Sequence, residues 1–333
     1  MNRLDPQPVP ETTGRLARQR DVATAGRDRG RKRRVLGAVY ADALMLRSIS
    51  ADVVHAADPR HLAQRPPDAD PFALRDPDYI ARTLPAIRLM GDVWFRADVR
   101  GLENIPPRGP ILLVGNHSGG TLIADTFIFA QAFYDHFGPE REFFQLAHDL
   151  VFKVPGIRAM LAPYGTVPAS PENMRRALAR EAALLVYPGG DHETYRASWH
   201  SAEIDFAHRT GFVRLALKHG VQIVPVVSIG GQETALFLGQ GEHVARLLHL
   251  HRLLRIDVAP VQIAPPWGIT VLDLPGRLPL PAKISIAVLP PIDLREELGG
   301  ADGDPDQGYE LVTGRMQDAL HELDEARALP LIG

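Results

Sequence analysis

Short apolar runs alternate with amphipathic segments through the middle of the chain. Each run is long enough for a buried strand, and the segments between them carry apolar residues at the three- and four-residue spacing of a helix. The runs that predict strands lie at 110–113, 143–147, 163–170, 183–187 and 221–227. Strands that alternate with helices in this way predict an α/β fold, in which a mostly parallel or mixed central sheet is flanked by helices.

A helical segment is predicted in front of this core. Leu36–Val54 and Asp78–Phe95 have apolar residues at helical spacing, and the Pro- and Asp-rich stretch 58–78 between them predicts a linker. The residues before Leu36 are rich in Arg, Pro and Gly and show no apolar period, which is typical of a disordered arm. The predicted organisation is a basic arm at 1–35, a helical segment and linker at 36–95, and the α/β domain at 96–333.

The chain after the predicted core is less regular. Glu242–Asp257 is predicted to be an amphipathic helix, and its histidines are interpreted as a polar face because no acidic pattern of a metal site accompanies them. These histidines are His243, His249 and His251. Residues 259–280 combine many prolines with aliphatic side chains, which indicates a surface against lipid or an acyl chain and not a regular core. The last predicted elements are a strand at 284–288 and a helix at 307–326.

Composition and charge limit the classes of protein. The 333 residues, 45% hydrophobic and 23% charged, are typical of a globular protein, and the net charge of −3 gives no general attraction to nucleic acid. The charge is uneven, because residues 1–35 contain ten basic and four acidic residues. Within them, Arg31–Arg34 could hold anionic lipid headgroups. The absence of cysteine excludes disulfides, thiolate metal sites and a thiol nucleophile.

Neither a secretory signal nor a spanning helix is predicted. The start of the chain has no apolar core of the kind that a signal peptide carries. No window reaches the roughly 18–20 apolar residues that a membrane-spanning helix needs. We therefore expect a protein that is soluble or lies on a membrane without crossing it.

The stretch Val114–Asp125 combines a strand end, a glycine turn and the start of a helix. Gly119 and Gly120 allow backbone conformations that are closed to other residues, and they let a substrate approach the main chain closely. His117 at the carboxyl end of the strand could take a proton at neutral pH, and Asp125 could orient and polarise its ring. His117 and Asp125 are therefore the candidate catalytic pair.

The spacing of this pair sets a geometric condition. Asp125 follows His117 by eight positions, which along a regular helix would place it about 12 Å away on the same face. The Gly-Gly turn must fold back if the two side chains are to meet.

An α/β hydrolase with Ser118 as nucleophile is a rival interpretation. It is disfavoured because adjacent residues on a turn do not easily form a nucleophile–base pair, and because the chain has no GxSxG elbow.

Four sequence blocks together resemble the glycerolipid acyltransferase superfamily, which includes the lysophosphatidic acid acyltransferases. In chain order the blocks are Asn116–Gly120 with Asp125, Gly165–Ser170, Tyr187–Gly190 with Glu193, and Ile223–Val226. The third block is most similar to the branch that contains the type 2 diacylglycerol acyltransferases, where Pro-Gly-Gly and a Glu replace Pro-Glu-Gly-Thr-Arg. The order and separations of the blocks fit the family over residues 95–295.

The resemblance implies an O-acyltransferase that moves a fatty acyl group from acyl-CoA or acyl carrier protein to a lipid hydroxyl. His117 would be the general base, Asp125 would hold its ring, and the backbone N–H groups of the two glycines would stabilise the oxyanion. Such an enzyme needs no metal, no other cofactor and no covalent acyl-enzyme. The residues implied to bind substrates are Asn116, Ser118, Gly119, Gly120, Gly165, Thr166, Pro188, Gly189, Gly190 and Glu193. The implied partners are the acyl thioester donor, the lipid alcohol acceptor and the inner face of the cell membrane, on which a cytoplasmic protein would lie peripherally.

Glu193 bears on the choice of acceptor. It stands where the phosphatidate-forming members of the family carry an arginine for the acceptor's phosphate, and a carboxylate that faces a phosphate is unfavourable. This favours an acceptor without a phosphate, such as a diacylglycerol or another lipid alcohol. The alternative is a lysophospholipid acyltransferase, for which Arg175, Arg176 and Arg196 are candidate phosphate ligands. A lipid-binding homologue without catalysis is a further alternative.

Overall fold

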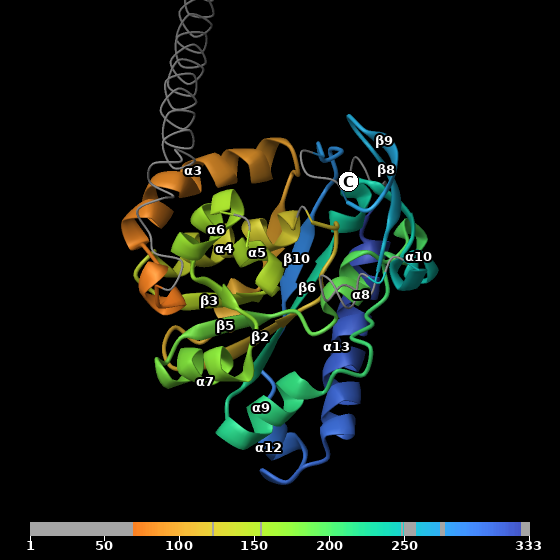
Figure 1. The fold of residues 1–333 in the computed structure, drawn as a ribbon. Helices are drawn as coiled ribbons and strands as arrows, with labels where there is room; N and C mark the ends of the chain where they lie inside the picture. Colours follow the sequence, from red (N-terminus) through yellow and green to blue (C-terminus); the bar gives the residue numbers. More distant parts are fainter. Residues whose placement is uncertain are drawn as a thin grey trace, which may run out of the picture. The chain divides into compact units, whose positions relative to one another are not determined.

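A seven-stranded sheet organises the part of the chain that the computed structural model describes, namely residues 69–121, 123–153, 155–247, 249, 258–273 and 277–327. Its strand order is β1-β10-β6-β2-β5-β3-β4 (Figure 1). The strands are β1 (Asp98–Arg100), β2 (Ile111–Gly115), β3 (Phe143–Ala147), β4 (Thr166–Pro168), β5 (Ala183–Val186), β6 (Ile223–Ile229) and β10 (Ser285–Val288). The predicted basic arm and the predicted helix Leu36–Val54 lie outside the described residues.

Strand β2 lies at the centre of this sheet and runs parallel to both of its neighbours. Leu113 is paired with Leu185 of β5 on one side and with Val224 of β6 on the other. Strands β3 and β4 continue the parallel order, whereas β10 is antiparallel to β6. The prediction of an α/β fold with a mostly parallel or mixed sheet is confirmed. Because β2, β5 and β6 are parallel, the segments that follow them meet at one edge of the sheet.

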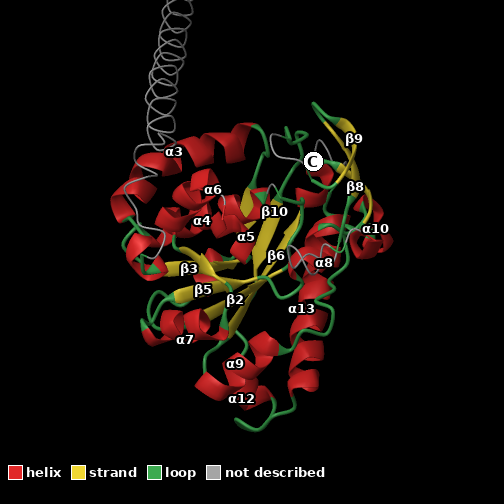
Figure 2. Ribbon diagram, viewed as in Figure 1, coloured by secondary structure: helices red, strands yellow, loops and turns green. Residues whose placement is uncertain are grey.

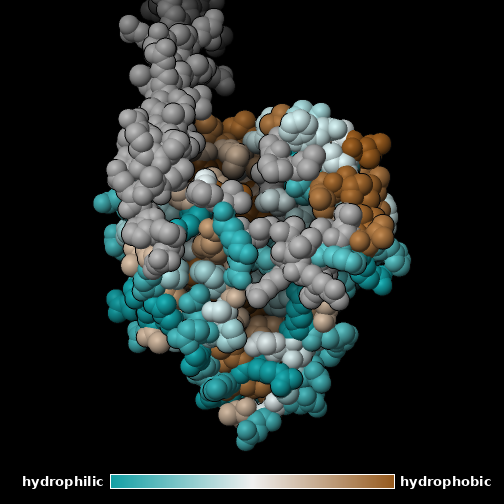
Figure 3. All heavy atoms as spheres, in the orientation of Figure 1, coloured by the Kyte–Doolittle hydropathy of each residue, from teal (hydrophilic) through white to brown (hydrophobic). Residues whose placement is uncertain are grey.

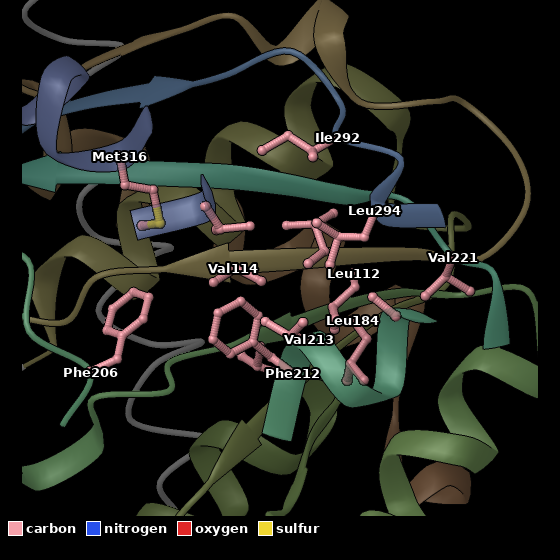
Figure 4. Packing of buried hydrophobic residues seen from close by; sticks show 14 of the residues in the cluster. Leu112, Val114, Leu184, Phe206, Phe212, Val213, Val221, Ile292, Leu294 and Met316 are labelled. Atoms are coloured by element: carbon pink, nitrogen blue, oxygen red, sulfur yellow. The ribbon is translucent and has the colours of Figure 1, made fainter. Parts of the chain in front are cut away.

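Helices cover both faces of the sheet (Figures 1 and 2). Side chains of α3 and α4 join one buried cluster, and side chains of α7, α9 and α13 join the other. Strand β2 contributes to both, because Leu113 belongs to the first cluster and Leu112 to the second, where it packs with Phe212 and Val213 (Figure 4). With both faces covered, a strand needs no polar side and reads as a continuous apolar run.

The helices have the following bounds. The α-helices are α3 (Pro77–Val93), α4 (Ala124–Phe137), α5 (Asp149–Lys153), α6 (Pro155–Leu161), α7 (Pro171–Ala179), α8 (Gly190–Thr194), α9 (Gly211–His219), α10 (Glu242–Leu247), α12 (Leu294–Glu297) and α13 (Pro305–Glu325). The 3-10 helices are η1 (Pro71–Leu74), η2 (Leu102–Asn104), η3 (Ala162–Tyr164), η4 (Ser198–His200) and η5 (Gly231–Thr234). None of the helices in the described residues is both long and apolar enough to cross a membrane.

Local signals in the sequence set several helix ends. Ser170 is the N-cap of α7, where its side chain accepts a hydrogen bond from the backbone N–H of Asn173. Gly220 ends α9 in the left-handed conformation, with φ of +64°. The predicted division at Pro155 separates α5 from α6.

The prediction for the segment after β6 was wrong in part. A second sheet of antiparallel strands, ordered β7-β8-β9, forms there from Leu236–Gly239, Val261–Ala264 and Gly268–Val271. Two regular strands therefore form within the proline-rich stretch 259–280, because its prolines lie before, between and after β8 and β9 and leave their ladder N–H groups intact. Helix α10 covers the first part of the predicted helix Glu242–Asp257, and most of the remainder lies outside the described residues.

The end of the predicted linker 58–78 is structured. Helix η1 buries Phe72 against Phe144 of β3, with the two ring centroids 4.8 Å apart. Helix α3 begins three residues later, at Pro77. The side chain of Asp76 caps it by accepting the backbone N–H of Tyr79 at 2.9 Å. The predicted helix Asp78–Phe95 is thus present, and the linker ends earlier than its composition indicates.

Candidate active site

The turn after β2 brings the predicted catalytic pair together. His117 follows the carboxyl end of β2, and α4 begins only at Ala124, so the residues between them form a turn. Gly119 and Gly120 take φ values of +90° and +68° in that turn. The chain therefore folds back, and Nδ1 of His117 lies 3.6 Å from Oδ2 of Asp125. A regular helix would have separated the two residues by about 12 Å.

Asp125 is buried and held by several donors. Its Oδ2 accepts the backbone N–H of Ser118 at 3.2 Å, and the hydroxyl oxygens of Ser118 and Ser228 lie 3.4 Å from the same atom. Its Oδ1 accepts the backbone N–H of Thr126 at 2.7 Å. The carboxylate is therefore fixed in direction, with one oxygen toward the ring of His117.

The imidazole of His117 is held against an aromatic ring. It stacks on Tyr187 with ring centroids 4.2 Å apart and an angle of 21° between the planes. Nδ1 is buried without a hydrogen-bond partner and faces Asp125, at a distance longer than a hydrogen bond. The side chain is 13% exposed. The ring thus keeps limited access to the outside while one of its nitrogens points at a carboxylate.

The backbone N–H groups of the turn are used to hold the turn itself. The acceptors for the five N–H groups from His117 to Thr121 are, in order, Glu193 Oε2, Asp125 Oδ2, Gln232 Oε1, the carbonyl of Thr194 and Asp273 Oδ2. The N–H groups of Gly119 and Gly120 are therefore engaged at 3.1 and 3.2 Å. The oxyanion site implied for these two glycines is not formed in this conformation.

Glu193 lies behind the turn, with its side chain inside the protein. It is fully buried, its Oε2 accepts the backbone N–H of His117 at 2.9 Å, and its Oε1 lies 3.0 Å from Nη1 of Arg196. Burial raises the pKa of the Glu193 carboxyl from 4.5 to about 7, and this effect outweighs the opposite effects of Arg196 and of the His117 N–H. Glu193 is therefore too buried to select against a phosphate on the acceptor in the way expected from the sequence.

Asn116 joins the turn to β6. Its side-chain nitrogen donates to the carbonyl of Ser228 at 2.8 Å, and its side-chain oxygen accepts the N–H of Ser228 at 2.7 Å. Both ends of the buried amide are thus occupied within the protein. Asn116 positions the turn beside β6, and its amide is not free for the substrate contact that the resemblance implies.

The Pro-Gly-Gly turn after β5 sets the start of α8. The carbonyls of Pro188 and Gly189 accept hydrogen bonds from Nη1 of Arg209 at 3.1 and 2.9 Å. A Cβ atom on Gly189 would lie 2.6 Å from Cβ of Glu193, and Gly190 has a positive φ of +53°. Small residues are therefore required for this turn, which brings Glu193 behind His117.

Gly165 and Thr166 are not brought to the His117 turn. Strand β4 is three strands from β2, about 14 Å across the sheet. Gly165 has φ of +85°, and a Cβ atom there would lie 2.3 Å from the carbonyl oxygen of Phe143. Oγ1 of Thr166 accepts a hydrogen bond from Gln145 at 2.7 Å. Both residues therefore have evident roles within the sheet, and nothing in their position supports the predicted contact with substrate.

The three arginines that were candidates for binding a phosphate are each paired with a carboxylate. The pairs are Arg175 with Glu172, Arg176 with Asp70, and Arg196 with Glu193.

The part of the chain that the structure describes contains no group of three or more His, Cys, Asp or Glu side chains that could hold a metal ion.

Several residues of the site were not singled out from the sequence. Tyr187 lies within the third sequence block, and its position directly after a strand was the available signal. Ser228 and Gln232 lie just beyond the fourth block, where a buried strand ends. Asp273 and Arg277 lie in the stretch predicted to be a lipid surface, and no local signal marks them as contacts of a turn about 150 positions earlier.

Comparison with known proteins tests the resemblance found in the sequence. Residues 96–229 match the family model named Acyltransferase. The chain is 31% identical over 242 residues to an uncharacterised protein of Mycobacterium tuberculosis, a match that covers 72% of this chain and 64% of the relative. These matches confirm the resemblance to the glycerolipid acyltransferase superfamily.

Two further relatives carry descriptive names. The human "DGAT1/2-independent enzyme synthesizing storage lipids" is 29% identical over 163 residues, 47% of each chain. Phytyl ester synthase 2 of Arabidopsis thaliana is 32% identical over 144 residues, 40% of this chain and 19% of the relative. Among solved structures, the 1-acyl-sn-glycerophosphate acyltransferase PlsC of Thermotoga maritima matches with a TM-score of 0.47 and 17% identity, over 76% of this chain and 83% of that one.

Proposed function

We propose that this protein is an O-acyltransferase that moves a fatty acyl group from an acyl thioester, of CoA or of an acyl carrier protein, to the hydroxyl of a glycerolipid or another lipid alcohol. The observation that carries the proposal is the 3.6 Å approach of His117 Nδ1 to the buried carboxylate of Asp125 at the carboxyl end of β2. The family of residues 96–229 supports the same reaction class.

His117 would act as the general base through Nε2. A proton on Nδ1 directed at Asp125 leaves the lone pair of the ring on Nε2, and the ionised carboxylate stabilises the imidazolium that forms. The distance of 3.6 Å is compatible with this role, because catalytic hydrogen bonds are often long in structures without substrate. Stacking on Tyr187 limits rotation of the ring out of this orientation.

In the proposed chemical step the protein supplies a base and no nucleophile, and the acceptor oxygen attacks the thioester directly. Nε2 removes the proton from the acceptor hydroxyl as its oxygen attacks the carbonyl carbon of the thioester. The tetrahedral intermediate collapses, the C–S bond breaks, and the leaving thiolate takes the proton back from the imidazolium. The products are the ester and the free thiol, so the step balances without a cofactor.

A neutral lipid alcohol is the acceptor that the observations favour. The relatives named above make storage lipids in one case and phytyl esters in the other, and phytol is a long-chain alcohol. The arginines that could have bound a phosphate are each paired with a carboxylate. A lysophospholipid acceptor is the alternative that the test must separate.

The test offers purified protein radiolabelled palmitoyl-CoA together with diacylglycerol, a long-chain alcohol or a lysophospholipid in parallel. Transfer to the neutral alcohols is expected, and His117→Ala should lower the rate by about a hundred- to ten-thousand-fold. His192→Ala is the matched control, because His192 is also a histidine paired with an aspartate, with Nε2 at 2.8 Å from Asp205. It should retain the wild-type rate.

The other outcomes change the proposal in defined ways. Transfer to the lysophospholipid alone would overturn the choice of acceptor and leave the reaction class in place. An unchanged rate in His117→Ala would remove the base assignment. If no acceptor is esterified with either palmitoyl-CoA or palmitoyl acyl carrier protein while lipid binding persists, the chain is a non-catalytic lipid-binding homologue.

Peripheral attachment to the cytoplasmic face of the membrane is part of the proposal, and an apolar rim supports it. The rim comprises Val93, Trp94, Trp267, Ile269 and Leu278, all at least 44% exposed. Two hydrogen bonds link the chain segments that carry these residues. One runs from Trp94 Nε1 to the carbonyl of residue 279, and the other from the N–H of Leu278 to the carbonyl of residue 265. Figure 3 shows the hydrophobic surface gathered over β8 and β9. Residues 258–272 contain no charged side chain, which suits contact with hydrocarbon.

Binding to vesicles tests this attachment. The double variant Trp267→Glu/Ile269→Glu should bind vesicles of mixed neutral and anionic phospholipid several-fold less than the wild type. Ala301→Glu/Gln307→Glu adds the same charge to exposed residues near the start of α13 and should bind as the wild type does. Deletion of residues 1–34 should weaken binding to anionic vesicles at low salt. Equal binding by the rim variant and its control would rule out the rim as the attachment surface.

A further inference from the structure

We infer that Asp273 and Arg277 are positioning residues for the His117 turn, although both follow β9 of the small sheet, more than 150 positions later in the chain. The inference rests on the proposed function, because it assigns the two residues to the orientation of the proposed base. Neither residue belongs to the sequence blocks that carry the family resemblance.

The pair holds the turn at two points on either side of Gly120. Oδ2 of Asp273 accepts the backbone N–H of Thr121 at 2.6 Å. Nη2 of Arg277 donates to the carbonyl of Gly119 at 2.6 Å. Between these contacts Gly120 has φ of +68°, and a Cβ atom there would lie 2.4 Å from Oδ2 of Asp273. The turn thus packs directly against the carboxylate of Asp273, and the conformation of the turn depends on the position of that carboxylate.

The ion pair itself is buried and hydrogen-bonded on several sides. Nε of Arg277 lies 3.0 Å from Oδ1 of Asp273, and both side chains are no more than 3% exposed. Nη1 of Arg277 donates to the carbonyl of Thr234 at 3.1 Å, so all three nitrogens of the guanidinium have acceptors. The amide of Gln262 on β8 donates to Oδ1 of Asp273 at 2.8 Å. The small sheet therefore fixes the pair, and the pair fixes the turn.

The position of the turn decides the position of the base. His117 is two residues before Gly119, and the same turn sets the path of the chain from His117 to Asp125. A displacement of about 1 Å at a reacting group lowers a rate by about a hundred-fold. A change in the pair should therefore reduce the rate of the chemical step, while the binding of substrates remains.

Two conservative substitutions test the inference in the full chain. Asp273→Asn keeps the shape of the side chain but places an N–H₂ group among donors. Arg277→Lys keeps the charge but cannot reach Asp273, Gly119 and Thr234 together. The matched control is Arg295→Lys, since Arg295 also donates to two backbone carbonyls, those of Leu217 at 2.7 Å and Lys218 at 2.9 Å, in the last turn of α9.

Three quantities are measured for each variant: kcat and KM with palmitoyl-CoA and the preferred acceptor, the melting temperature, and the imidazole NMR resonances of His117, assigned with His117→Ala. Both variants should lose about a hundred-fold in kcat with KM within twofold, and their His117 resonances should shift. Arg295→Lys should change the melting temperature without either effect. The NMR measurement decides the inference even if the wild type transfers no acyl group, an outcome that would count against the proposed function alone.

Two outcomes would overturn the inference. One is a kcat within twofold of the wild type in both variants together with unmoved His117 resonances. The other is a loss of activity in both variants that the fraction of unfolded protein at the assay temperature fully accounts for. If Asp273→Asn does not fold, Arg277→Lys decides, because it retains the buried charge.

Discussion

The large sheet and the small sheet use apolar residues in opposite ways. All residues of β2 and β5 are buried, because helices cover both faces of the large sheet. In the small sheet, β9 is mostly exposed, with Ile269 at 71% exposure. An apolar run therefore forms a strand in both places, but the run does not tell whether another layer will cover the strand.

Strand β8 shows the difference most clearly, since its alternation is inverted. Polar Gln262 is buried and donates to Asp273, whereas apolar Ile263 points to the outside with 36% exposure. A strand with one solvated face normally places its apolar residues inward. The inversion follows from what each face of the small sheet meets: the inner face contacts the buried ion pair of Asp273 and Arg277, and the outer face is exposed. We draw four predictions from this comparison.

The largest expected effect is in the centre of the large sheet. Leu113→Ala removes a fully buried side chain between two layers and should lower the free energy of unfolding by about 2–5 kcal/mol, since it leaves a cavity. Chemical denaturation measured by circular dichroism checks this value. A loss under 1 kcal/mol would mean that the layers around β2 collapse to fill the space.

The second prediction concerns the buried carboxyl group of Glu193 in α8. Between pH about 4.5 and about 7 the unfolded chain has released the proton of Glu193 while the folded protein retains it. The free energy of unfolding should therefore fall as the pH rises through this interval, by on the order of 3 kcal/mol at about 1.4 kcal/mol per pKa unit.

Glu193→Gln provides the comparison for that pH dependence. The amide does not titrate, so the fall attributed to Glu193 should be missing when the variant is denatured across the same pH series. Parallel curves for the two proteins would show that Glu193 ionises in the folded state near its ordinary pKa.

The third prediction tests the inverted alternation in β8. Gln262→Leu removes a buried donor to the Asp273 carboxylate and should destabilise the protein by about 1–3 kcal/mol. Ile263→Gln, the matching change on the outer face, should be nearly neutral. Thermal melts of the two variants decide the point, and equal losses would contradict the assignment of inner and outer faces.

The smallest effect is expected on the outer face of the small sheet. Ile269→Ser removes an exposed side chain and should change the free energy of unfolding by no more than about 0.5 kcal/mol. Denaturation in the absence of lipid is the measurement. A loss comparable to that of Leu113→Ala would show that the rim is covered in the free protein.

Much of the fold could be predicted because its signals are local. The apolar runs gave the parallel strands from β2 to β6, and Ser170, Pro155 and Gly220 marked helix boundaries that the structure contains. Strand β7 and the β8–β9 hairpin were not predicted, because β8 has an inverted pattern and prolines surround it.

The candidate site was predictable only where its residues lie in short motifs. His117 and Asp125 were identified from the sequence, and the need for a folded-back turn followed from their spacing. The surrounding residues make contacts within the protein that the sequence did not predict. The N–H groups of Gly119 and Gly120 are engaged, Asn116 holds β6, and Glu193 is buried behind the turn.

The sequence by itself determined the strand–helix alternation, the glycines of the His117 turn and the family, because each depends on residues that are neighbours in the chain. The tertiary structure decided which groups of the predicted site remain available to a substrate and which are already hydrogen-bonded within the protein. The hydrogen bonds of the turn come from α4, α8, η5 and the segment after β9, which are brought together only by the packing of the two sheets. A buried polar group must find a partner wherever the fold supplies one, and that partner's place in the sequence is not fixed by any local pattern.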